Sequence, residues 1–71
     1  MTHMSIPEFR DAYPVDAWCE VNALLWSCMD EWVAARVIEH SIDGFITLRL
    51  PNNLIIETAD PTTVRPLRRI Q

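Results

Sequence analysis

Few residues in this chain have the types and spacing that chemistry requires. Cys19, Cys28, His3 and His40 lack the paired CxxC or histidine spacing of a zinc site. Cys28 would need a nearby base to form a reactive thiolate, and His40 ends the next predicted strand, far from the loop that holds Cys28. We therefore predict two inert, partly buried thiols and no metal ligands.

Other catalytic signatures are weak as well. Gly44 is the single glycine, so the chain cannot form a glycine-rich phosphate-binding loop. Asp30 and Glu31 are adjacent carboxylates, but adjacent acids in a loop are usually only solvated. The sequence therefore predicts a protein that is not an enzyme and that uses no cofactor.

Charge is distributed unevenly along the chain. Residues 1–35 contain six acids and one arginine, residues 36–71 contain four acids and five arginines, and there is no lysine. The net charge of −4 argues against general duplex binding, which depends on neutralising phosphates. A local anion-binding face could still form from the arginines of the second half: Arg36, Arg49, Arg65, Arg68 and Arg69. The last three could equally protect the edge of a C-terminal strand, which is the simpler role.

The size of the chain implies one domain with a small core. With 71 residues it is near the lower limit for folding without disulfides or metal, and about 3–5 kcal/mol of stability is typical at this size. Dimerisation would therefore not be surprising. The longest uncharged stretch, between Glu20 and Asp30, is too short to cross a membrane, and the first residues do not resemble a signal peptide. We expect a cytoplasmic protein with reduced cysteines.

An N-terminal extension is predicted over residues 1–14, with a short helix over residues 6–12. Ser5 and Glu8 have the spacing of a capping box, and Pro14 ends the helix.

Two periods compete in the segment from Val15 to Asp43, which contains no glycine or proline. In a helix, one face would collect residues spaced three or four apart: Trp18, Val21, Leu25, Cys28, Trp32 and Ala35. In two strands, Trp18 and Trp32 would point outward instead. The periodicity alone slightly favours the helix.

The second half of the chain favours strands. Asp43-Gly44 predicts a type I′ hairpin turn, in which both central residues need positive φ, and a hairpin needs a strand before its turn. Asp60-Pro61 predicts one turn of helix before a last strand. We therefore predict an all-β fold with strands near residues 17–25, 31–40, 44–50, 53–58 and 64–68. The predicted core consists of inward residues: Cys19, Val21, Val33, Ala35, Val37, Ile46, Leu48, Leu50, Leu54, Ile56 and Val64.

Three motifs within residues 15–71 resemble the SH3-like barrels of the Tudor and agenet "royal" group. "EWVAARVIEH" is similar to their Trp-x-x-Ala-x-Val second strand, and after a short turn it is followed by "GFITLRL". The closing "DPTTVRPL" is similar to their Asp-Leu-Arg-Pro-Leu ending. The resemblance implies a small five-stranded barrel with a one-turn helix before the last strand.

The resemblance also suggests a role for Trp32. In Tudor-like barrels, an aromatic residue at this place forms one wall of a cage that binds a methylated Lys or Arg by cation–π attraction. Trp26 lies where a second wall would come. The third strand and its turn read "LRLPNN", where the family usually has more aromatics, and Arg49 there would repel a cation. The resemblance therefore implies a two-walled cleft and not a complete cage.

Two functions are consistent with these residues. The first is a non-catalytic binding module that docks a basic or arginine-bearing peptide of a partner protein at an aromatic and acidic lip: Trp26, Asp30, Glu31, Trp32, Phe45 and Arg49. The second is a nucleic-acid-associated regulator, or a small phage or bacterial inhibitor of a larger machine, with Arg36, Arg65, Arg68 and Arg69 as its anion-binding face. A purely structural alternative is that the indoles of Trp32 and Trp18 seal the ends of the barrel. We favour the first function.

Overall fold

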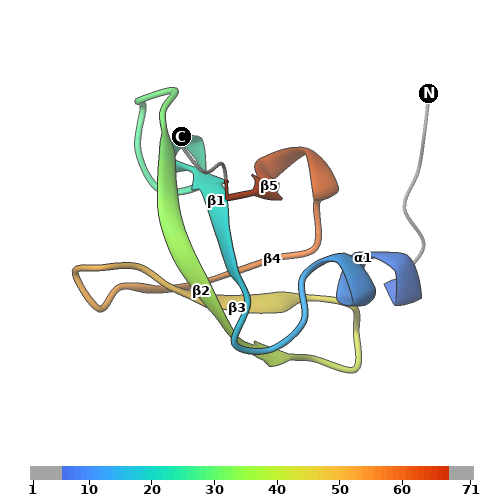
Figure 1. The fold of residues 1–71 in the computed structure, drawn as a ribbon. Helices are drawn as coiled ribbons and strands as arrows, with labels where there is room; N and C mark the ends of the chain where they lie inside the picture. The colour runs from blue at the N-terminus through green and yellow to red at the C-terminus, as the bar shows by residue number, and fades with distance from the viewer. Residues whose placement is uncertain (1–5, 68–71) are drawn as a thin grey trace.

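A computed structural model of the chain describes residues 6–67 and contains one five-stranded antiparallel sheet (Figure 1). Its strands are β1 (Trp18–Asn22), β2 (Trp32–His40), β3 (Ile46–Arg49), β4 (Ile55–Thr58) and β5 (Val64–Pro66). The helical segments are α1 (Ile6–Ala12) and the two 3₁₀ turns η1 (Ala23–Leu25) and η2 (Pro61–Thr63). The all-β class, the N-terminal helix and the helical turn before the last strand are confirmed. The helical alternative for residues 16–40 is wrong, because β1 and β2 pair with each other along this segment.

The sheet is open. Its strand order is β4-β3-β2-β1-β5, so β4 and β5 are edges and do not pair with each other. A closed barrel, as the Tudor resemblance implied, is therefore not observed among the described residues. The strand β5 is only three residues long and ends at Pro66, which has no N–H to donate, so it offers little backbone to a second partner.

The turn η2 carries the chain from β4 to β5. The Asp60 carboxylate caps it by accepting hydrogen bonds from the Thr62 N–H (2.9 Å) and the Thr62 hydroxyl (2.7 Å). These bonds stabilise the ionised carboxylate and lower the pKa of Asp60. The buried Thr58 hydroxyl lies 2.8 Å from that of Thr63. The Asp60-Pro61 signal thus predicted this turn correctly.

The hairpin loop between β2 and β3 has three residues, not two. The Ser41 N–H donates to the Phe45 carbonyl (2.9 Å), and the Gly44 N–H donates to the Ser41 carbonyl (3.3 Å). Gly44 has φ of 92°, whereas Asp43 is not among the residues with positive φ. The predicted type I′ turn is therefore wrong, and the loop is of the three-residue kind in which the last loop residue is left-handed.

The hairpin loop between β3 and β4 has the same form. The Leu50 N–H donates to the Leu54 carbonyl (2.9 Å), and the Asn53 N–H donates to the Leu50 carbonyl (2.9 Å). Asn53, with φ of 67°, occupies the position that Gly44 has in the preceding loop. Asparagine is one of the few residues that tolerate this conformation.

Most of the predicted core is buried. The buried members of the predicted set are Cys19, Val21, Ala35, Val37, Ile46, Leu48, Leu50 and Val64. Val33 and Ile56 are half-buried, and Ile56 packs against the core from the edge strand β4. The prediction for Leu54 is wrong: its side chain is 38% exposed, and the residue lies between the hairpin loop and β4.

The sequence did not indicate that α1 completes the core. Phe9 and Tyr13 join the core cluster with residues of β1, β2, β3 and β5, and the two rings meet edge to face with centroids 5.4 Å apart. The Tyr13 hydroxyl donates to the Val64 carbonyl (3.3 Å). Arg10 donates to the Ser41 carbonyl (2.5 Å), which holds α1 beside the β2–β3 hairpin (Figure 1).

Candidate functional site

The loop that joins β1 and β2 lies at the end of the sheet opposite α1 (Figure 1). Asn22, at the end of β1, organises it. The Asn22 side-chain oxygen accepts from the Leu24 N–H (2.9 Å), which caps η1, and its side-chain nitrogen donates to the Asp30 carboxylate (2.8 Å). The Ala23 N–H closes the loop by donating to the Glu31 carbonyl (2.8 Å). One buried asparagine thus fixes both ends of the loop.

Apolar side chains project from this loop into solvent. Their exposed fractions are 55% for Leu24, 41% for Leu25, 37% for Trp26 and 59% for Met29. Two exposed acids, Asp30 and Glu31, follow them. We call these six residues the loop surface. Scattered exposed apolar residues are ordinary, but a consecutive group on an ordered loop is typical of an interaction site.

Trp32 has a different environment from the one predicted. It is half-buried, and the guanidinium carbon of Arg65 lies 4.3 Å from its ring centroid. The Arg65 Nε donates to the Glu20 carboxylate (2.6 Å), and the two side chains are 35% and 17% exposed. An arginine of the chain itself therefore already covers the indole, and a carboxylate neutralises that arginine.

Two other residues of the predicted lip are not at this end of the sheet. Phe45 belongs to the β2–β3 hairpin, at the opposite end of β2 from Trp32, and is 41% exposed. Arg49 is paired in register with Arg36 on the outer face of the sheet. The structure thus brings Trp26, Asp30, Glu31 and Trp32 together at one end and leaves Phe45 and Arg49 apart from them.

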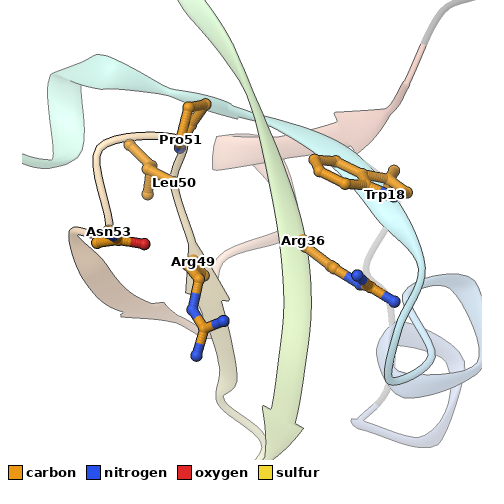
Figure 2. Close-up of a pocket in the computed structure, with 6 residues that line it drawn as sticks. All are labelled: Trp18, Arg36, Arg49, Leu50, Pro51 and Asn53. Carbon is orange, nitrogen blue, oxygen red and sulfur yellow. The ribbon is translucent and has the colours of Figure 1, made fainter.

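Arg49 lines a second feature, a shallow pocket of about 230 Å³ on the outer face. The other lining residues are Trp18, Arg36, Leu50, Pro51 and Asn53 (Figure 2). We call this site the arginine pocket. Trp18 is 52% exposed, so it does not seal the core as the structural alternative supposed. The strand alternation, which placed Trp18 and Arg36 outward, was the signal that could have located the pocket.

The arginines predicted as an anion-binding face are not equivalent. The Arg36 side chain lies 3.5 Å from the Asp16 carboxylate, and both groups are largely exposed. Arg65 is engaged by Glu20 and Trp32. Arg68 and Arg69 lie outside the described residues.

The two thiols differ in exposure. Cys19 is fully buried, and burial, followed by the charge of Glu20, raises the pKa of its thiol to about 11. Cys28 is exposed, so the prediction of a partly buried thiol is wrong for it. The Nε2 atom of His40 lies 2.7 Å from the Tyr13 carbonyl oxygen. Within residues 6–67, no cluster of three His, Cys, Asp or Glu side chains is suited to a metal ion.

No helix in the described part of the chain is both long and apolar enough to cross a membrane. Comparisons of the chain with family models, with curated proteins and with solved structures find no match. The resemblance to Tudor-like domains therefore stays a prediction.

Proposed function

We propose that this protein is a non-catalytic binding module whose loop surface docks a partner peptide that carries apolar side chains beside arginine or lysine. The observation that carries this proposal is the group of exposed apolar side chains at Leu24, Leu25, Trp26 and Met29. Leaving these side chains in water is unfavourable by roughly 25 cal/mol per Å² of apolar surface. A partner that covers them recovers this free energy.

The order of the loop supports the proposal. Besides the bonds made by Asn22, the N–H groups of Trp26 and Ser27 both donate to the Ala23 carbonyl (3.0 and 2.8 Å). The Met29 N–H donates to the Ser27 hydroxyl (3.1 Å). A loop that is already ordered loses little conformational entropy on binding, so more of the contact energy appears as affinity.

Charge indicates which peptide fits. Asp30 and Glu31 adjoin the apolar group, and the Glu31 side chain makes no ion pair among the described residues. Rim carboxylates of this kind attract basic partners and accelerate their association. The guanidinium of Arg65 over the indole of Trp32, neutralised by Glu20, illustrates at the same end of the sheet how an arginine is held by a tryptophan and an acid.

We further propose that the open sheet is a variant of the Tudor-like, SH3-like barrel. The support is the number and antiparallel order of its strands and the single 3₁₀ turn before β5. In this variant the aromatic contact of the binding surface would come chiefly from Trp26, since Arg65 covers Trp32.

A display library of random twelve-residue peptides, selected on the immobilised full chain, tests the function. We expect the enriched peptides to combine arginine or lysine with aliphatic or aromatic residues. Trp26→Ala should weaken their binding at least about thirtyfold, the effect of an interface hot spot. Glu31→Gln should mainly slow association.

Trp18→Ala is the matched control, because Trp18 is also an exposed tryptophan but lies in the arginine pocket. It should leave peptide affinity unchanged. Selection without enrichment, or enriched peptides that bind Trp26→Ala as well as wild type, would refute the proposal. Analytical ultracentrifugation that finds a dimer in wild type and a monomer in Trp26→Ala would show that the surface binds a second copy of the chain instead.

A further inference from the structure

The arginine pocket combines groups from three neighbouring strands. In the sheet register, Trp18 of β1 is paired with Arg36 of β2, and Arg36 is paired with Arg49 of β3. Figure 2 shows Trp18 and the Arg36 side chain on one side of β2, and Arg49 with the turn that contains Pro51 and Asn53 on the other side. The pocket therefore has an indole on one side, a proline on the other, and two guanidinium groups.

The positive charge of this pocket is poorly compensated. Arg36 and Arg49 are directly opposite each other, an arrangement of like charges that destabilises a sheet. Arg36 has an exposed ion pair with Asp16 at 3.5 Å. The side chain of Arg49 makes no hydrogen bond or ion pair with any of the described residues. Although the chain has a net charge of −4, the arginine pocket is a local site of excess positive charge that could bind an anion.

The other tryptophan–arginine pair on the same face shows what the pocket lacks. Arg65 lies 4.3 Å from the Trp32 ring, and the Glu20 carboxylate accepts its Nε hydrogen bond at 2.6 Å. Arg36 lies 5.9 Å from the Trp18 ring, near the limit for such contacts, and Trp18 stays 52% exposed. The first pair is complete without a ligand. The second leaves the indole of Trp18 half exposed and lies beside Arg49, whose guanidinium has no ion pair among the described residues.

We propose that the arginine pocket binds one nucleotide, with its phosphate between Arg36 and Arg49 and its base stacked on Trp18. A cationic groove beside an exposed aromatic ring is the usual composition of a site for unpaired nucleotides, and guanidinium groups match the oxygens of a phosphate. The pocket is smaller than most ligand pockets, which have about 300–1,000 Å³. Its size and the net negative charge of the chain favour a single nucleotide over a long tract. The nucleotide is either free or one unit of a single strand.

Titration of the ¹⁵N-labelled full chain, followed by two-dimensional NMR, tests this proposal. The probes are AMP, adenosine, inorganic phosphate and a four-residue deoxyadenosine oligonucleotide. We expect AMP to shift the indole signal of Trp18 and the amide of Arg49 and to leave the indole signal of Trp26 in place. Adenosine and phosphate should each bind at least tenfold more weakly than AMP, because each provides half of the contacts. If the oligonucleotide binds more tightly than AMP, the source is a single strand; if the two bind equally, it is the free nucleotide.

Two variants locate the site. Trp18→Ala and Arg49→Ala should each weaken AMP binding at least tenfold, and Arg49→Lys should retain part of the affinity because it keeps the charge but not the planar donor group. Thermal melting verifies that the variants are folded, which we expect because both side chains are exposed. Trp26→Ala, the matched control, should bind AMP like wild type, so a failure here is distinguishable from a failure of peptide docking.

Three results would overturn the proposal. The first is the absence of an AMP-induced shift at Trp18. The second is equal affinity for phosphate and AMP, which would mean that the pocket recognises an anion without a base. The third is tighter binding of a phosphoserine peptide than of AMP or the oligonucleotide, which would assign the pocket to a phosphorylated protein.

Discussion

Replacing Phe9 with alanine tests whether α1 is an integral part of the core. Phe9 is 2% exposed, and its ring packs edge to face against Tyr13 with centroids 5.4 Å apart. Removing a buried phenylalanine ring costs about 3–5 kcal/mol, through lost burial and the cavity left behind. A domain of this size has about 3–5 kcal/mol of total stability. We therefore expect Phe9→Ala to be largely unfolded at 25 °C.

Urea denaturation followed by far-UV circular dichroism measures the loss in free energy of unfolding. Two variants with smaller expected losses serve for comparison. Tyr13→Phe keeps the ring but removes the hydroxyl that donates to the Val64 carbonyl, so its free energy of unfolding should fall by about 0.5–1.5 kcal/mol. Val15→Ala changes a residue of the following loop that is 48% exposed, and it should stay within about 0.5 kcal/mol of wild type.

Unfolding of Phe9→Ala at the same urea concentration as wild type would contradict this expectation. That result would mean that the helix is not needed to cover the inner face of the open sheet. Equal losses in Phe9→Ala and Val15→Ala would also contradict it, because they would show that burial does not distinguish the two positions.

Three further predictions concern the sheet and its thiols. Trp32→Ala and Glu20→Gln should each lower the free energy of unfolding by about 1 kcal/mol. The double variant should lose less than the sum of the two, since both residues contact Arg65. Strict additivity in urea denaturation would show that the three groups are independent. Gly44→Ala should cost about 1–2 kcal/mol because Gly44 has positive φ, whereas Asn53→Gly should be nearly neutral; equal melting temperatures of the two variants would contradict this. At pH 8 a thiol reagent should modify Cys28 rapidly and Cys19 slowly, since Cys19 is buried and its pKa is about 11. The folded-state pKa of the Cys19 thiol lies above its ordinary value of 9.0. The contribution of this thiol to the free energy of unfolding is therefore complete below pH 9 and is lost as the pH rises toward 11. Cys19→Ala should lose less stability than wild type over this pH range.

The sequence by itself determined the features that depend on neighbours along the chain. Alternation around Asp43-Gly44 predicted the strands, and Asp60-Pro61 predicted η2, because turns, caps and strand patterns involve residues only a few positions apart. Even here the turn type was wrong. The Asp43-Gly44 dipeptide predicts positive φ at both residues. In the structure only Gly44 of the two has positive φ, and it lies in a three-residue loop.

The loop surface was only partly predicted from the sequence. Trp26 was identified as a binding residue through the resemblance to Tudor-like barrels, and Asp30 and Glu31 because they are the acids next to Trp32 in the sequence. Their exposed neighbours Leu24 and Met29 were not. Whether an apolar residue beside a strand turns inward depends on how the loop is closed, and here the side chain of Asn22 closes it.

Only the tertiary structure decided which distant residues meet. Phe9 lies on a helix of seven residues, and Tyr13 directly follows that helix. The helix is too short for its periodicity to reveal which surface it covers. Arg65 reaches Trp32 and Glu20 because β5 pairs with β1, with Glu20 opposite Arg65. Trp18, Arg36 and Arg49 meet because two registers align them across three strands. A register shift of one residue would place these side chains on the other face, and the register depends on loop lengths and core packing together, which no short stretch of sequence specifies.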